Sequence, residues 1–81
     1  MNIRAILYAQ LRDLAGTSEI DVDLDETATV SELLEQLYRS APKLRTQDKN
    51  ILVGAGVEFV GRNYRLKPDQ EIAIMPPVQG G

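Results

Sequence analysis

The sequence contains no cysteine and no histidine. Without cysteine the chain forms no disulfide, so the fold depends on its hydrophobic core alone. The missing thiol and imidazole groups also exclude a thiolate nucleophile, a Ser-His pair and an ordinary zinc site. Any chemistry by this chain must therefore use carboxylates, lysines or the chain terminus itself.

Basic residues are also scarce, since 9 Lys and Arg face 12 Asp and Glu, for a net charge of -3. This balance, with no basic run, argues against nucleic acid or an anionic membrane as the main partner. No apolar run approaches the ~18 residues of a membrane span, and residues 1–4 lack the character of a signal peptide. We therefore expect a single cytoplasmic domain of 81 residues, with no nucleic-acid or membrane partner.

Two stretches before residue 25 have the hydrophobic pattern of β-strands. Residues 3–9 are apolar on both faces, which is typical of a central strand. One face carries Ile3, Ala5 and Leu7, and the other carries Arg4, Ile6 and Tyr8. Residues 19–24 alternate between apolar and acidic side chains, which predicts a half-buried strand. The segment between them, residues 10–18, is expected to be a polar connection.

One amphipathic helix is predicted after residue 29. Thr29 and Glu32 have the spacing of a capping box, in which each side chain bonds a backbone N–H at the helix start. The apolar positions that follow form one helical face over about three turns. They are Val30, Leu33, Leu34, Leu37, Tyr38 and Ala41. Pro42 ends the helix, because proline cannot continue the hydrogen-bond ladder.

The remaining chain predicts three more strands. Residues 43–50 are polar and predict a loop, with a short helical turn as the alternative. Strands are expected at residues 51–53, 57–60 and 71–75, which gives the order β-β-α-β-β-β. A helix that crosses the sheet makes the first and last strands parallel neighbours at its centre. We therefore predict an α+β protein with the β-grasp fold, a mixed sheet with one main helix packed on one face.

The predicted β-grasp domain, residues 1–75, leads directly into an extended tail. Pro76-Pro77 favours an extended path, so residues 76–81 can reach about 20 Å at roughly 3.3–3.6 Å per residue. Gly80-Gly81 leaves the terminal carboxylate without neighbouring side chains, so that it can enter a narrow channel. An α-carboxyl group is an anion at neutral pH, and it could attack the α-phosphate of ATP.

The face of the sheet away from the helix is a candidate docking surface. If Leu7 faces the helix, Tyr8 points to the uncovered side, and alternation along the last strand places Met75 there too. Phe59, the only phenylalanine, could join them from a neighbouring strand. Single exposed apolar side chains are common, but an aromatic and methionine cluster beside a functional tail is typical of docking. We predict that Tyr8, Phe59 and Met75 bind a partner.

Two other patterns do not predict a ligand site. Gly54-Ala55-Gly56 lacks the spacing of a phosphate-binding loop and no helix follows it, so a strand end or bulge is expected. Four carboxylates have the spacing of a calcium loop, namely Asp21, Asp23, Asp25 and Glu32. Glu26 stands where such a loop needs glycine. No metal and no bound cofactor are expected.

Several stretches resemble a known family, the MoaD-like sulfur-carrier subunits of molybdopterin synthase, which are related to ubiquitin. The family's FAxxRExxG opening is similar to Tyr8-Ala9-Gln10-Leu11-Arg12-Asp13-Leu14-Ala15-Gly16. Its PPVxGG ending is similar to Ile74-Met75-Pro76-Pro77-Val78-Gln79-Gly80-Gly81. The helix from Thr29 also fits, and the resemblance covers essentially the whole chain. Two places differ, since members often have Val-Asn at Ala55-Gly56 and Gly-Asp at Asp69-Gln70.

The resemblance implies a carrier mechanism with Gly80 and Gly81 at the reacting end. A ubiquitin-activating-type enzyme would use ATP to adenylate the Gly81 carboxylate, and a sulfur donor protein would convert the adenylate to a thiocarboxylate. The tail residues Pro76, Pro77, Val78 and Gln79 would then enter the large subunit of molybdopterin synthase, within a heterotetramer. The sulfur would go to a cyclic pyranopterin to form the dithiolene of molybdopterin. Catalytic side chains would come from the large subunit, and this chain would bind no cofactor.

Three other functions remain open. A sulfur carrier for thiazole synthesis shares the fold and the Gly-Gly end but typically lacks Pro76-Pro77. A protein modifier, joined to target lysines by isopeptide bonds, begins with the same adenylate. A plain interaction domain with an inert tail would use the fold alone.

Overall fold

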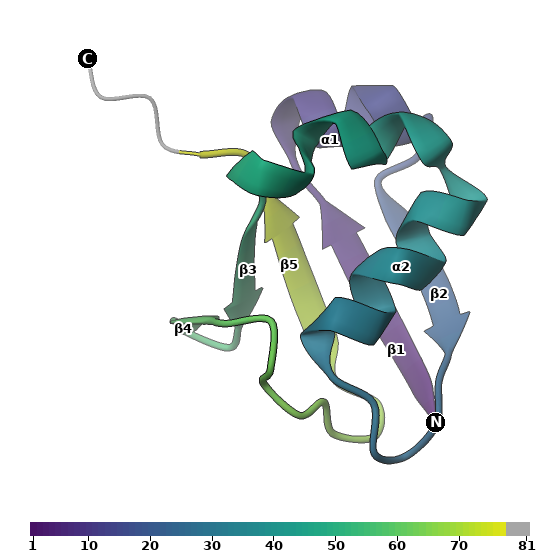
Figure 1. Ribbon diagram of the computed structural model, residues 1–81, viewed down its shortest axis with the longest axis vertical. Coiled ribbons are helices and arrows are strands. Elements are labelled where there is room, and N and C mark those ends of the chain that lie inside the picture. The colour runs from purple at the N-terminus through teal and green to yellow at the C-terminus, as the bar shows by residue number, and fades with distance from the viewer. Residues whose placement is uncertain (78–81) are drawn as a thin grey trace.

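Five strands form one mixed sheet in the computed structural model, which describes residues 1–77 (Figure 1). The strand order is β2-β1-β5-β3-β4. The strands are β1 Asn2–Leu7, β2 Glu19–Asp23, β3 Leu52–Ala55, β4 Glu58–Val60 and β5 Glu71–Met75. β1 and β5 are parallel, and the other neighbouring pairs are antiparallel. The parallel pairing predicted for the first and last strands is confirmed, and so is the β-grasp fold.

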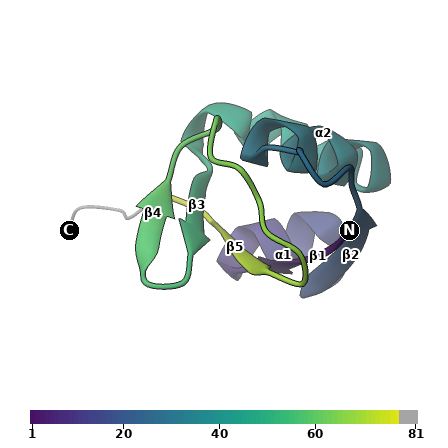
Figure 2. The same cartoon turned by 90° about the horizontal axis from the view of Figure 1, so that it is seen from below.

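Helix α2, Val30–Ser40, packs on one face of this sheet (Figure 2). Its predicted apolar face is buried, and Leu33, Leu34 and Leu37 have no exposed surface. The inward face of β1 and β5 completes the core with Ile3, Ala5, Leu7, Ile72 and Ile74. Because successive residues of a strand point to opposite faces, the alternate residues of β1 and β5 lie on the face away from α2.

The start of α2 is held by backbone carbonyls rather than by the predicted capping box. Thr29 is the N-cap residue, but its side chain makes no cap hydrogen bond. The N–H of Val30 donates instead to Tyr64 O at 3.0 Å. The N–H of Ser31 donates to Arg62 O at 2.9 Å. The capping-box prediction is wrong because acceptors from a loop distant in sequence satisfy the first helical donors.

Helix α1, Ala9–Ala15, stands where the sequence predicted the end of the first strand and most of a polar connection over residues 10–18. Leu11 is fully buried on its inner face, and Leu14 packs at the edge of the same core. Gly16 ends the helix in the left-handed conformation, with φ 76°, and its N–H bonds the preceding turn. Leu11 and Leu14, three residues apart and followed by a glycine that ends the helix, are a helix signal even in a short polar segment. The prediction of a connection without a helix is therefore wrong.

A 3-10 helix, η1, fills Pro42–Asn50, where the sequence predicted a loop or a short helical turn. Proline suits its first position because the missing N–H would have no partner there. Leu44 is fully buried and anchors η1 to the core. None of the helices within residues 1–77 is both long and apolar enough to cross a membrane.

Each of the two departures from the family pattern includes one turn residue with positive φ. Gly56, between β3 and β4, has φ 64°, and Asp69, before β5, has φ 61°. Glycine adopts this region freely, and aspartate is among the residues that tolerate it. Each turn therefore retains a residue suited to its backbone.

Candidate functional site

One row of residues crosses the open face of the sheet in register. Ile6 on β1 pairs with Ala73 on β5. Ala73 pairs with Gly54 on β3, and Gly54 pairs with Phe59 on β4. Residues paired across neighbouring strands lie on the same face. Since Ala73 has only a methyl group and Gly54 has no side chain, little side-chain volume covers the backbone at the centre of this row.

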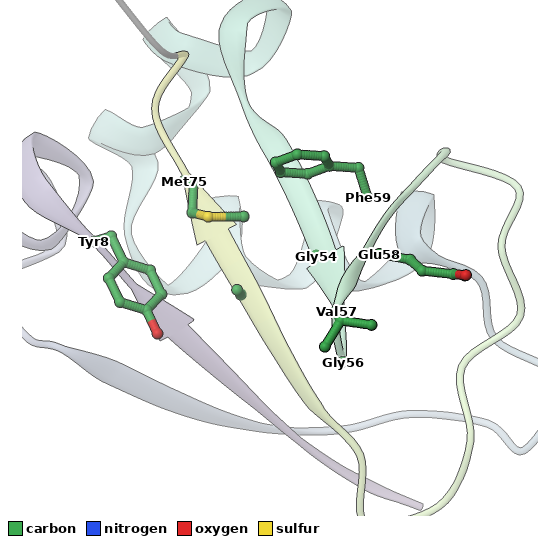
Figure 3. Close-up of a pocket in the computed structure, with 8 residues that line it drawn as sticks. Tyr8, Gly54, Gly56, Val57, Glu58, Phe59 and Met75 are labelled. Carbon is green, nitrogen blue, oxygen red and sulfur yellow. The ribbon is translucent and has the colours of Figure 1, made fainter.

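A hollow of about 280 Å³ lies over the centre of this row (Figure 3). Gly54 and Ala73 line it, as expected for residues whose small side chains leave the backbone uncovered. Tyr8 and Phe59 stand on opposite sides, and the side chain of Met75 lies between them. Val57, in the turn before β4, also lines the hollow. We call Tyr8, Val57, Phe59 and Met75 the open-face cluster.

The open-face cluster contains the large hydrophobic side chains that are exposed within residues 1–77. Tyr8 is 47% exposed, Phe59 is 67% exposed and Val57 is fully exposed. The sequence analysis does not name Val57, although alternation along the strand expected at residues 57–60 places it on the same face as Phe59. Exposed apolar patches of this kind mark interaction sites. The role of Tyr8, Phe59 and Met75 in partner binding stays a prediction.

The backbone around Tyr8 fixes its place at the side of the hollow. Its N–H continues the β1–β5 ladder by donating to Ile74 O at 3.1 Å. The next residue, Ala9, has φ 51°, a left-handed conformation that costs a residue with a Cβ about 1–2 kcal/mol. The chain thus turns sharply into α1 directly after Tyr8. The side chain of Tyr8 is left on the open face while Leu11 enters the core.

The tail begins beside the same cluster. β5 ends at Met75, and Pro76 and Pro77 follow it directly. The predictions for Val78, Gln79, Gly80 and Gly81 lie outside the described residues. The division into a domain of residues 1–75 and a tail of residues 76–81 stays a prediction.

The charged side chains of Arg4, Asp21 and Glu71 on the sheet pair with one another and do not line the 280 Å³ hollow. Arg4 lies between two carboxylates, 3.5 Å from Asp21 and 3.6 Å from Glu71. All three side chains are exposed, so the pairs contribute little to stability. Asp25 accepts a hydrogen bond from the N–H of Glu26 at 2.8 Å. Across residues 1–77 no three acidic side chains converge where they could hold a metal ion.

Perturbed pKa values occur on the helix side of the molecule, at a network that does not line the hollow. The Tyr38 hydroxyl donates to Asp48 Oδ1, and Arg62 Nη1 donates to the same oxygen at 2.8 Å. The hydrogen bond from Tyr38, followed by that from Arg62, holds the pKa of Asp48 below its usual range. Burial, followed by the bond to Asp48, raises the pKa of Tyr38. These groups hold α2, η1 and the segment after β4 together.

The strand order β2-β1-β5-β3-β4, with a parallel central pair and α2 on one face, defines a ubiquitin-like protein of the β-grasp class. The chain belongs to the ThiS family, whose model matches residues 5–81. It is 31% identical over 83 aligned residues to the molybdopterin synthase sulfur carrier subunit of Chlamydomonas reinhardtii, with 100% of both chains covered. The corresponding subunit of Drosophila yakuba is also 31% identical, over 100% of this chain and 92% of that one. Among solved structures, SAMP1 from Haloferax volcanii has a TM-score of 0.88 and 29% identity, with 100% of both chains covered.

Proposed function

We propose that the chain is a sulfur carrier for molybdenum cofactor biosynthesis, acting as the small subunit of molybdopterin synthase. The observation that carries this proposal is the similarity, over the whole chain, to proteins named molybdopterin synthase sulfur carrier subunit. A likeness confined to the sheet and helices would support the fold alone. The aligned region extends through the tail, which holds the groups that the proposed chemistry needs.

The reagent in this proposal is the carboxylate of Gly81. Its oxygen attacks the α-phosphate of ATP on a ubiquitin-activating-type enzyme, and pyrophosphate leaves. The acyl carbon is then electrophilic, so a sulfide nucleophile delivered by a sulfur donor protein forms a C–S bond to it, AMP leaves and a thiocarboxylate remains. A thiocarboxylate is a better nucleophile than a carboxylate, which suits it to forming the dithiolene of molybdopterin. Gly80 adds no side chain next to the reacting carbon, so the end of the chain fits a narrow channel.

We place the large subunit of the synthase on the open-face cluster. Met75 lines the hollow and also ends β5, so a partner seated there meets the start of the tail. Exposed aromatic side chains and methionine supply large apolar contact areas, and methionine adapts its shape to a partner. The extended Pro76-Pro77 segment then leads Val78 and Gln79 into the partner, whose side chains provide catalysis. The complex is expected to be a cytoplasmic heterotetramer.

One observation favours a second candidate function, conjugation to other proteins. SAMP1 of Haloferax volcanii, named small archaeal modifier protein 1, is similar over the whole chain at 29% identity. A modifier uses the same terminal adenylate, but a lysine amine instead of sulfur attacks the acyl carbon. The two functions therefore share the fold and the activation step, and they differ in the nucleophile that reacts with the adenylate.

Purification of the chain from its native cells, with intact mass measurement and identification of bound proteins, separates these functions. The proposal predicts a large subunit of molybdopterin synthase in the complex and a fraction of the chain with sulfur in place of one oxygen. Thiazole synthase as the bound protein would indicate the thiazole pathway. Isopeptide-linked targets without a synthase subunit would support the modifier function and overturn the proposal.

A further inference from the structure

Strand β4 carries one side of the hollow, and among its residues only Val60 packs against the hydrophobic core. It has three residues, lies at the edge of the sheet and is paired with β3. Phe59 is 67% exposed, so its own packing does little to hold the strand in place. Tyr8, on the opposite side of the hollow, continues the central β1–β5 ladder. The distance between the two sides therefore depends on what fixes β4.

Arg62, two residues after the end of β4, makes the contacts that can fix it. Its guanidinium donates from Nη1 to Asp48 Oδ1 at 2.8 Å and from Nη2 to the main-chain oxygen of Asp48. Asp48 lies in η1, shortly before β3, so these bonds close the base of the β3–β4 hairpin. A guanidinium that bonds a carboxylate and a carbonyl at once sets direction as well as distance.

The same residue is tied to both halves of α2. The carbonyl of Arg62 accepts the N–H of Ser31 at 2.9 Å, in the first turn of the helix. The carboxylate that Arg62 binds also accepts the hydroxyl of Tyr38, near the end of the helix. Tyr38 is only 3% exposed, so the helix end of this chain of bonds is rigidly packed. A closed ring of hydrogen bonds thus runs from the helix start through Arg62 and Asp48 to the helix end.

We propose that Arg62 is a positioning residue for the docking surface: through Asp48 and Tyr38 it fixes β4, and so holds Phe59 at the side of the hollow where a partner binds. This inference rests on the proposed function, because it takes the open-face cluster as the docking surface. Arg62 itself does not line the hollow and does not touch the tail residues Pro76 and Pro77 through any hydrogen bond or ion pair among the described residues.

The test compares Arg62→Ala with Arg62→Lys and with the control Arg45→Ala. Arg45 stacks on Tyr38, 4.9 Å from the ring centroid, and pairs with Glu35 at 3.2 Å. It is therefore a second arginine on the same network that is bonded to the helix instead of the β3–β4 hairpin. The first readout is amide hydrogen exchange by NMR. Exchange should become faster in Arg62→Ala at Glu58 and Val60, the residues of β4 whose N–H groups face β3. It should stay unchanged in β1 and β5, and Arg62→Lys should be intermediate.

The second readout is the Kd for the large subunit of molybdopterin synthase from the same organism. If Arg62→Ala leaves the docking-competent position of β4 populated about one tenth of the time, the apparent Kd rises about tenfold. Arg45→Ala should change the Kd by less than about twofold. In a protein that already carries Phe59→Ala, Arg62→Ala should also change the Kd by less than about twofold, because Arg62 acts on binding only through the position of Phe59. Unchanged exchange in β4 would overturn the proposal, as would a tenfold loss that persists in the Phe59→Ala background.

These outcomes are distinguishable from failure of the proposed function. If Phe59→Ala alone leaves the Kd unchanged, the open-face cluster is not the docking surface, and the proposed mode of binding is wrong. In that case amide hydrogen exchange alone tests whether Arg62 fixes the position of β4. Faster exchange confined to β4 in Arg62→Ala supports the role of Arg62, and unchanged exchange contradicts it.

Discussion

The terminal methyl group of Met75 lies 3.1 Å from the point where a Cβ on Gly54 would stand. The absence of a side chain at Gly54 thus leaves the room in which Met75 crosses the hollow. The neighbouring Ala73 Cβ would be 3.6 Å away, an ordinary contact. The reason for glycine at this position is steric and not conformational, since the φ of Gly54 is not positive.

Gly54→Ala should therefore separate docking from stability. Met75 is flexible at its end and can move by a few tenths of an ångström, so the free energy of unfolding should change by less than about 1 kcal/mol. The added methyl group raises the floor of the hollow and displaces Met75, so the Kd for the large subunit should rise. The matched control is Gly61→Ala, whose Cβ would meet only the end of Asn63, at 3.4 Å. Urea unfolding and calorimetric binding measurements check both variants. An equal Kd for the two variants would contradict the prediction that the space above Gly54 is needed for docking.

Phe59→Glu should abolish docking and leave the fold intact. The side chain is 67% exposed in the free protein, so a carboxylate there stays hydrated until a partner covers it. Burying it unpaired in the complex would then be costly, by several kcal/mol for an ionised group. The control is Ser31→Glu, an exposed position at the start of α2 on the other side of the sheet. Circular dichroism should be unchanged in both, and binding should be lost only in Phe59→Glu.

The free energy of unfolding should depend on pH through two groups, Asp48 at acid pH and Tyr38 at alkaline pH. The pKa of Asp48 is lowered in the folded state, so its contribution is present above about pH 4 and is lost as the pH falls through the folded value. The pKa of Tyr38 is raised, so its contribution is present below about pH 10 and is lost as the pH rises toward the folded value.

The measurement is the difference in urea midpoint between the wild type and Tyr38→Phe from acid to alkaline pH. Taking this difference removes the titration of groups common to both proteins. It should be largest between about pH 5 and pH 9 and should shrink at both ends. A difference that stays constant over the whole range would show that Tyr38 stabilises the fold by packing alone.

The sequence is a good guide where a pattern is local and repeated. The helical face of α2 and the alternation in β1 and β5 each identify buried positions directly, and the parallel β1–β5 pair is a consequence of the crossover. Where partners come from distant segments, the sequence is a poor guide. The first donors of α2 bond Tyr64 and Arg62, so a correct Thr29–Glu32 spacing produces no capping bond.

The candidate site shows the same limits. Tyr8, Phe59 and Met75 can be identified because alternation along each strand tells which face a residue occupies. The hollow between them cannot be predicted, because it depends on the register that places Gly54 beside both Ala73 and Phe59.

Two further features escape sequence reasoning for related reasons. Helix α1 is missed because Leu11, Leu14 and Gly16 are a weak signal in a short, largely polar segment. The ring through Arg62 is missed because its side-chain hydrogen bonds join residues 10 and 14 positions apart in sequence, and its backbone bond joins Ser31 to Arg62. These hydrogen bonds join different elements, so no strand or helix periodicity indicates them.

The proposed carrier function makes its most direct prediction at the terminal glycine. Deletion of Gly81 moves the reacting carbon by one residue, roughly 3.3–3.6 Å, and a misplacement of even 1 Å can cost on the order of a hundredfold in rate. The truncated chain should still fold and still bind the large subunit, because the open-face cluster is unchanged. The decisive measurement is intact mass after incubation with ATP, the adenylating enzyme and a sulfur donor. We expect the full-length chain to gain the mass of sulfur replacing oxygen and the truncated chain to remain unmodified, whereas equal sulfur loading of both chains would contradict the carrier function.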